Sequence, residues 1–334
     1  MEFISVSALN EKPLISIITP LYNKEKYIKR ALGSVFKQSY GNFEAIVIDD
    51  GSSDSSAQMV SDYEDSRIRL VSQENTGPGA ARNRGIHESK GKYLAFIDAD
   101  DEWLPKYLEK AIEAFNDSKT KVVVADFFRG ENYSNSYLQQ FQDIKPGFNG
   151  INREDSWITL DKYINLFHSS SVVISKDELS KYSGFYEKNR CTWGEDSYLW
   201  IQVILNNHFF VISEPLTILH YDGSELGYSR KTAHPPRPML YEYDKILNNT
   251  PKNMIRLVKE LFNQYTLHCI MELDDAKDFK NIRMLLNIYP LTFVFNTKYI
   301  VFRMKYKYPH FYLCLKSVKV AMRAMKEYLK KKCV

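Results

Sequence analysis

Short apolar runs alternate with segments of helical periodicity along the first hundred residues of the chain. Four runs rich in β-branched and aromatic residues predict buried strands: Leu14–Thr19, Phe43–Ile48, Ile68–Ser72 and Tyr93–Ile97. Apolar residues recur at helical spacing in Tyr22–Lys37 and Ser56–Glu64, and the loop Asn75–Ile86 opens a further helix. This alternation with short connections predicts a doubly wound α/β fold with a mostly parallel sheet and flanking helices.

The pattern changes after the last of these strands. Phe127–Ile158 is rich in aromatic residues, Asn and Gln and is weakly patterned, whereas Ser197–Leu205 predicts a largely apolar helix. Asn253–Leu273 and Phe279–Asn287 predict helices outside the sheet, which form a C-terminal helical extension. Phe311–Lys332 predicts an amphipathic helix with one apolar and one basic face. Its basic face carries Lys316, Lys319, Arg323, Lys326 and Lys330.

Charge is distributed unevenly along a chain of ordinary globular composition. Of the 334 residues, 44% are hydrophobic and 26% are charged, and the formal net charge is +4. Lys298–Val334 holds 11 Lys and Arg against one acid, Glu327, so the body before it is mildly acidic. This balance argues against nucleic acid as a partner of the body.

The cysteines and the apolar segments bear on the cellular location. The four cysteines have no metal-ligand spacing, which fits a reducing cytoplasm without a disulfide framework. Residues 1–13 form a polar leader that lacks the features of a secretory signal. The uncharged run Met284–Thr297 is too short to span a bilayer and contains Pro290. We therefore expect a cytoplasmic protein with no membrane-crossing segment.

Asp98, Ala99 and Asp100 directly follow the strand Tyr93–Ile97. Side chains two apart in an extended chain share a face, so Asp98 and Asp100 are expected to converge. Two such carboxylates repel each other unless a counter-charge is present, and Mg²⁺ or Mn²⁺ supplies one while bridging to substrate phosphates. The alternative is a solvated acidic turn that caps a helix starting at Trp103.

Three further polar clusters follow strands or line the adjacent loops: Tyr22-Asn23, Asp49-Asp50 and Arg82-Asn83. Ligands of doubly wound sheets bind beyond the carboxyl ends of the strands, where all these clusters are expected to meet. The sequence contains neither a GxGxxG fingerprint nor a P-loop lysine motif. A metal at Asp98 and Asp100, with Arg82 nearby, would bind phosphates in their place, and a tyrosine such as Tyr22 could stack on a base.

Four stretches resemble the nucleotide-binding half of glycosyltransferase family 2, inverting enzymes of the GT-A fold: PLISIITPLYNKEKYI, VIDDGSSDSS, NTGPGAARNRGI and YLAFIDADD. The resemblance runs from Pro13 to Asp101 without a gap and with the motifs in order. It continues more loosely through His168–Ile174, Gly184-Phe185 and Trp193–Asp196, and it fades after Ser229.

The resemblance implies roles for individual residues. Tyr22 would stack on the uracil of a UDP-sugar, Pro20 would shape the loop, Asp49 would bind the base and Asp98 the ribose. Asp100 would ligate Mn²⁺ or Mg²⁺, with Asp98 contributing directly or indirectly. The remaining residues that the resemblance assigns to nucleotide-sugar binding are Asn23, Glu25 and Arg82.

The resemblance also makes Asp196 the general base, supported by Glu195. An acceptor hydroxyl needs a carboxylate to take its proton, and an inverting displacement places that base opposite the leaving group. The alternative reading of Glu195 and Asp196 is an acidic first turn that complements a helix dipole. Leu219–Ser224 departs from the family pattern, which leaves roles for His220 and for the later Arg230 and Lys231 open.

The resulting expectation is a metal-dependent glycosyltransferase that uses a nucleotide-sugar donor and a glycan or lipid-linked acceptor, in bacterial surface polysaccharide or lipopolysaccharide biosynthesis. Residues 14–229 would form the catalytic domain, divided near residues 101 and 102, and residues 230–334 the extension. Residues 311–332 would dock on the anionic inner face of the cytoplasmic membrane or pack as a structural helix. Two other classes remain: a nucleotidyltransferase, and a non-catalytic glycan- or partner-binding member of the same fold.

Overall fold

The structure is a computed structural model of the chain. It describes residues 12–118, 120–130, 135–141, 143–223, 234–289, 300–301 and 304–306. The chain divides into two compact units, Met1–Arg230 with Arg237–Leu257, and Lys231–Pro236 with Val258–Val334. The catalytic domain of residues 14–229 that the sequence predicts remains a proposal.

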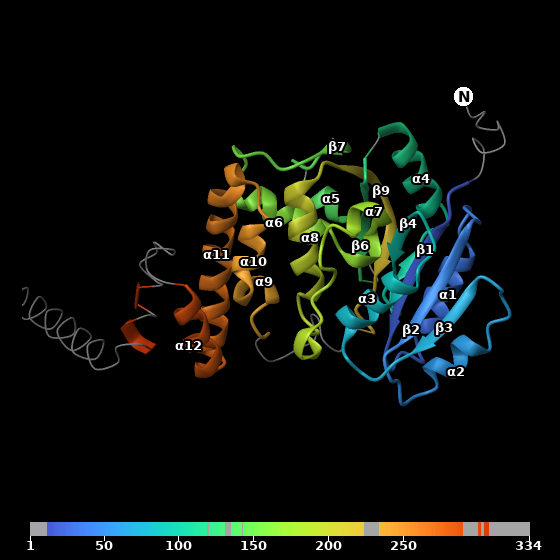
Figure 1. Ribbon diagram of the computed structural model, residues 1–334, viewed down its shortest axis with the longest axis horizontal. Coiled ribbons are helices and arrows are strands. Elements are labelled where there is room, and N and C mark those ends of the chain that lie inside the picture. Colours follow the sequence, from blue (N-terminus) through green and yellow to red (C-terminus); the bar gives the residue numbers. More distant parts are fainter. Residues whose placement is uncertain are drawn as a thin grey trace, which may run out of the picture. The chain divides into compact units, whose positions relative to one another are not determined.

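Strands and helices alternate through the first unit (Figure 1). The strands are β1 Ile15–Leu21, β2 Phe43–Asp49, β3 Ile68–Ser72, β4 Tyr93–Phe96, β5 Glu102–Trp103, β6 Val122–Arg129, β7 Gly147–Asn149, β8 Val172–Ser175 and β9 Phe209–Leu219. The longer helices are α1 Ile28–Phe36, α2 Ser56–Ser61, α3 Pro78–Glu88, α4 Tyr107–Ser118, α6 Trp157–Leu166 and α8 Glu195–Asn206. Short helices are α5 Tyr137–Gln140, α7 Lys176–Leu179, α9 Pro238–Tyr241 and α10 Tyr243–Asn248.

In the described ranges these strands form one mixed sheet in the order β3-β2-β1-β4-β8-β6-β9-β5, with β7 paired to β9. The β3-β2-β1-β4 half is parallel, as the sequence predicted. β8 is antiparallel to both of its neighbours, β4 and β6. The sheet is thus mixed, and the prediction of a mostly parallel α/β sheet with flanking helices is confirmed.

Helices cover both faces of the parallel half. On one face, Ile15 and Ile17 of β1 belong to a core cluster with Ala31 and Val35 of α1 and with residues of α4. On the other face, Ala81 of α3 packs with residues of β2. A side chain at Gly85 of α3 would come within 2.4 Å of Ile18, so this glycine permits the close approach of α3 to β1. The alternation of inward residues along β1 thus produces the doubly wound arrangement.

Two predicted helix starts differ from the structure. α1 begins at Ile28 rather than Tyr22, because the chain before it forms turns tied to the loop after β2. No helix starts at Trp103; Glu102 and Trp103 pair with β9 as the strand β5, and α4 begins at Tyr107. In both places tertiary hydrogen bonds replace the local helical ones.

The C-terminal part is helical, as predicted. α11 spans Ile255–Asp275 and α12 spans Phe279–Ile288. Within the second unit, Leu261, Phe262 and Leu285 are fully buried. Across the described ranges, no helix has both the length and the apolar character to cross a membrane. The predicted basic helix Phe311–Lys332 lies outside the described residues.

Candidate active site

The parallel strands bring the predicted polar clusters to one edge of the sheet. β1 pairs with both β2 and β4, so the residues that follow these three strands lie beside one another. Leu21 is the register partner of Asp49, and the Asp50 amide donates to the Leu21 carbonyl over 2.8 Å. Arg82 on α3 joins them by contacting Asp98. The predicted meeting of these clusters at the carboxyl edge is confirmed.

The segment after β1 is bound to the loop after β2. Asn23 has a positive φ of 50°, and its side-chain carbonyl accepts from the Ser53 amide over 2.8 Å. The Glu25 carboxylate accepts from the Ser55 amide over 3.1 Å. These contacts leave the ring of Tyr22, next to Pro20-Leu21 of β1, 46% exposed. An exposed ring on a well-tied turn suits stacking on a base, which remains a prediction.

Asp49 and Asp50 organise the neighbouring loops. Asp49 is buried and accepts from the Ser52 amide over 3.0 Å. The two oxygens of Asp50 accept from the Thr76 and Gly77 amides over 2.9 and 2.8 Å. Asp50 therefore holds the entrance of α3 in place, a structural role that the sequence prediction did not separate from that of Asp49.

Arg82 is the central cation of the site. Its guanidinium is almost fully buried and forms ion pairs with Asp98 at 2.6 Å and with Glu195 at 2.9 Å. Asp98 follows β4 and Glu195 opens α8, so one side chain connects the predicted nucleotide-binding half with the half that carries the predicted base. A direct contact of Arg82 with a donor stays a prediction.

Asp98 and Glu195 contact the Arg82 guanidinium, and Asp196 lies close enough to act on its charge. Burial raises the pKa of Glu195 to about 7, and the adjacent Asp196 adds to the rise. Burial also acts to raise the pKa of Asp98, but the net direction is downward because Arg82 lies against it. The positive charge therefore favours the ionised form of Asp98 more than that of Glu195, and the site has more negative than positive charge.

Glu195 and Asp196 occupy the first turn of α8. Gly194 precedes them with a left-handed φ of 75°, which turns the chain into the helix. Asp196 is partly exposed and accepts from the Ser197 amide over 2.7 Å. Both readings of this pair from the sequence thus remain physically consistent, and Asp196 stays the predicted base because it is the more accessible carboxylate.

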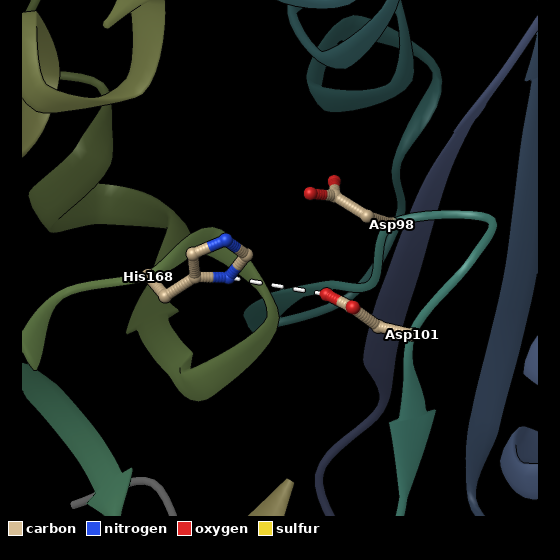
Figure 2. A group of neighbouring side chains, drawn as sticks. All are labelled: Asp98, Asp101 and His168. Carbon is tan, nitrogen blue, oxygen red and sulfur yellow. Dashed lines mark ion pairs between the residues drawn. The ribbon is translucent and has the colours of Figure 1, made fainter. Parts of the chain in front are cut away.

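The chain after β4 is not extended, contrary to our expectation for Asp98 and Asp100. The Asp101 amide donates to the Asp98 carbonyl over 3.0 Å, which closes a turn. This turn brings Asp98 and Asp101 together with His168 (Figure 2). Each of the three side chains offers one potential metal-ligand atom, and these atoms lie within 4.8 Å of one another. His168 Nδ1 lies 3.9 Å from Asp101 Oδ2.

Asp101 is a buried carboxylate that the sequence prediction did not assign. It accepts from the Ser170 hydroxyl over 2.5 Å and from the His220 amide over 3.2 Å. Burial and then the nearby Asp100 and Asp98 raise its pKa well above the usual value. Its place after Asp98 and Asp100 in the DADD run was the only signal available in the sequence.

Asp100 lies on the other side of the turn, where Lys24 Nζ contacts its Oδ2 at 2.8 Å. The carboxylate oxygens of Asp98 and Asp101, with the imidazole of His168, form a donor group that suits Mg²⁺ or Mn²⁺, and the predicted ligand Asp100 is not part of this group. The Lys24 ammonium supplies a positive charge at Asp100, the residue that the resemblance assigns to the metal ion. The donor set therefore fits a divalent ion, whose ligands at this turn remain a proposal.

His220 is held by neighbours rather than directed at a ligand in the described residues. Its Nε2 lies 3.3 Å from a Glu102 carboxylate oxygen, and its side chain is nearly buried. This arrangement favours a structural role. Arg230 and Lys231 lie outside the described residues.

Comparison with known proteins identifies the family. A family model described as glycosyl transferase family 2 matches residues 16–169. The chain is 31% identical over 204 residues to the Escherichia coli protein named UDP-Glc:alpha-D-GlcNAc-diphosphoundecaprenol beta-1,3-glucosyltransferase WfgD, covering 60% of this chain and 73% of WfgD. It is 35% identical over 160 residues to the putative glycosyltransferase EpsH of Bacillus subtilis, covering 44% of this chain and 46% of EpsH. The match thus spans less than half of EpsH.

Solved structures agree in fold. S. aureus TarS 1-349, crystallised with UDP, superposes with a TM-score of 0.62 at 17% identity, covering 88% of this chain and 91% of TarS 1-349. The mannosyltransferase PcManGT of Pyrobaculum calidifontis, in complex with GDP-Man and Mn²⁺, superposes with a TM-score of 0.53 at 17% identity. This match covers 85% of this chain and 78% of the PcManGT chain. The fold is that of the GT-A glycosyltransferases. The chain belongs to glycosyltransferase family 2.

Proposed function

We propose that this chain is a metal-dependent, inverting glycosyltransferase that moves a sugar from a UDP-sugar to a hydroxyl of a glycan or lipid-linked acceptor. The observation that carries the proposal is the pair of contacts made by Arg82. They connect a carboxylate at the end of β4 with a carboxylate at the start of α8, which supports a site in which the proposed donor half and the proposed base half would act together.

The donor half would bind the nucleotide and the metal. Tyr22 would stack on the base, while Asp49 and Asp98 would bind the nucleoside. Asn23 and Glu25 keep the loop of Tyr22 in place through their bonds to residues after β2. Asp100, with Asp98, would hold Mn²⁺ or Mg²⁺, which when bound stabilises negative charge on the departing diphosphate.

The acceptor half would supply the base. Asp196 would take the proton from the attacking hydroxyl, and the carboxylate lies on the helix that Arg82 anchors through Glu195. Attack from that side and departure of the diphosphate from the other side would invert the configuration at the sugar carbon.

The names of related proteins support the substrate classes. TarS has been crystallised with UDP-GlcNAc as well as UDP, and PcManGT with Mn²⁺. WfgD is named for a diphosphoundecaprenol-linked acceptor, and TuaG of B. subtilis for teichuronic acid biosynthesis. We infer a role in bacterial surface polysaccharide assembly on the cytoplasmic side, with residues 311–332 contacting the membrane.

A panel of nucleotide sugars tests the proposal. At least one, and a UDP-sugar in our assignment, should be hydrolysed or transferred with Mn²⁺ or Mg²⁺ and lose this turnover when a chelator is added. Asp196→Asn should keep donor affinity and lower transfer about 10²–10⁴-fold, because only proton removal is affected. Metal-independent turnover would contradict the metal assignment. Weaker donor binding with unchanged turnover of bound donor would make Asp196 a binding residue.

A further inference from the structure

Lys24 neutralises the carboxylate that we assign to the metal. Its Nζ contacts Asp100 Oδ2 at 2.8 Å and also donates to the Gly223 carbonyl. The Lys24 amide donates to Ser56 Oγ over 2.7 Å, which fixes the backbone from which the side chain extends. The ammonium is thus held at Asp100 by two acceptors and by a tied backbone.

The segment after β9 covers the same carboxylate. A Cβ added to Gly223 would lie 2.4 Å from Asp100 Cβ and 2.7 Å from Oδ2, so the backbone of Gly223 packs directly on this side chain. Asp222 keeps the segment there by accepting from both terminal nitrogens of Arg30 over 3.0 Å, and its carbonyl accepts from Tyr27. Arg30 also donates to the Asp100 carbonyl over 2.6 Å.

These contacts form one unit, which we call the Asp100 clasp: Lys24, Tyr27 and Arg30 on one side, and Asp222 and Gly223 on the other. It closes over Asp100 and leaves only 14% of that side chain exposed. A divalent ion on the covered oxygen would lie close to the ammonium, and the repulsion between the two cations favours release of Lys24 from Asp100.

We propose that Lys24 is an internal competitor of the metal ion that sets the affinity of the Asp100 site. The inference rests on the proposed function, in which Asp100 is a metal ligand. In the metal-free protein Lys24 neutralises Asp100. Metal binding then requires that the ammonium leave Oδ2, so the measured metal affinity contains the free energy of breaking this contact.

The test measures Mn²⁺ binding to the full chain without nucleotide, by electron paramagnetic resonance of the free ion. Lys24→Gln should bind Mn²⁺ about ten-fold more tightly, the gain expected if the released state is about 10% populated in the unmodified protein. Lys24→Arg, which keeps the charge, should bind close to the unmodified value. The gain in Lys24→Gln should persist at about 0.5 M salt, since contact pairs are screened little.

Lys26→Gln is the matched control. Lys26 is exposed and lies two residues from Lys24. Lys26→Gln removes the same charge as Lys24→Gln, and it should change the Mn²⁺ affinity less than two-fold. Equal gains in Lys26→Gln and Lys24→Gln would overturn the inference, because the effect would then be general electrostatics. Unchanged or weaker binding in Lys24→Gln would overturn it as well.

Asp100→Asn distinguishes a failure of the Lys24 proposal from a failure of the assignment of Asp100 as a metal ligand. If it abolishes Mn²⁺ binding while Lys24→Gln has no effect, the metal assignment stands and Lys24 is not a competitor. If Asp100→Asn binds Mn²⁺ like the unmodified protein, Asp100 is not a ligand, and the inference fails together with that part of the proposed function.

Discussion

Arg82 determines how charge is distributed among the carboxylates of the site. Its two ion pairs lie at 2.6 and 2.9 Å; the pair with Glu195 is buried, and the pair with Asp98 is partly buried. With Asp98, Glu195 and Asp196 near one guanidinium, a proton stabilises the site in the absence of metal, and the raised pKa of Glu195 identifies where it binds. Protonation of Glu195 weakens its pair with Arg82 and so reduces the connection between the two halves.

Glu195 should make folding stability depend on pH. Its pKa is about 7 in the folded chain against an ordinary value of 4.5 for a glutamate side chain, so the folded state binds more protons between these limits. The stabilisation is complete below about pH 4.5 and is lost as pH rises to about 7, on the order of 3 kcal/mol. Urea unfolding with chelator present, from pH 4.5 to 7.5, should show a shallower decline for Glu195→Gln than for the unmodified chain.

Parallel slopes for the two proteins would contradict the assignment of the raised pKa. The comparison uses the difference between the proteins because other carboxylates titrate in both. Arg69, which pairs with Glu88 on the surface, offers a control site: Glu88→Gln should leave the slope near pH 7 unchanged.

At the scale of elements, α3 carries a second connection besides Arg82. The side-chain amide of Asn83 donates to the Phe185 carbonyl and accepts from the Phe185 amide, both over 2.9 Å. Gly184 has a φ of 81°, and a Cβ there would lie 2.5 Å from Asn83 Oδ1. Asn83 thus pairs with the backbone of the segment that leads to α8, as a neighbouring strand would.

Asn83→Ala should separate chemistry from binding. Without the amide the segment before α8 loses its partner, and displacement of Asp196 by about 1 Å should lower kcat about 10–100-fold while the donor Kd stays within two-fold. Arg84→Ala, which removes only a surface pair with Glu88, is the control and should retain full turnover. Parallel losses of kcat and donor affinity in Asn83→Ala would indicate general unfolding instead.

The sequence predicted the parallel half of the sheet because its strands are short apolar runs with helices between them. Ile68–Ser72 was placed at its observed bounds, and the helix from Glu195 was recognised from its apolar core. The sequence offered the turn at Asp98–Asp101 only as the alternative to an extended chain. The burial of Asp101 and the strand at Glu102 were not predicted, because both depend on contacts with residues far along the chain.

The site was predictable as a set of residues but not as a geometry. Periodicity placed Asp49, Arg82 and Asp98 at one edge, because strand ends define that edge. Nothing local indicates that Arg82 pairs with a glutamate 113 positions later, or that Lys24 pairs with Asp100. These contacts arise from the packing of α3 and of the segments after β1 and β9, which a single sequence does not specify.

At the scale of the whole molecule, the basic segment 311–332 should control attachment to anionic membranes. Each basic residue near such a surface contributes about 1 kcal/mol, so the five basic residues on its predicted basic face should support binding at low salt. Replacing Lys316, Lys319, Arg323, Lys326 and Lys330 with Gln should abolish co-sedimentation with anionic liposomes. The unmodified chain should also fail to co-sediment when the liposomes are neutral or the salt concentration is high.

A second full-length variant controls for net charge. It replaces five basic residues that are exposed in the structure: Lys252, Lys259, Lys277, Lys280 and Arg283. This variant should sediment like the unmodified chain, because its charges are not on the predicted amphipathic helix. Equal loss of sedimentation in both variants, or none in the first, would make 311–332 a structural segment.

The position of β8 between β4 and β6 has a consequence for synthesis on the ribosome. β4 ends at Phe96 and β6 at Arg129, but the strand that joins them begins at Val172. At typical elongation rates, residues 97–171 take roughly 4–15 s to emerge. During this time the edge of β4 that will pair with β8 has no partner, and the corresponding edge of β6 has none once β6 has been made. The nascent chain is therefore exposed to strand mispairing and aggregation in this interval, and its yield should depend on chaperones that bind it before residue 175 is made.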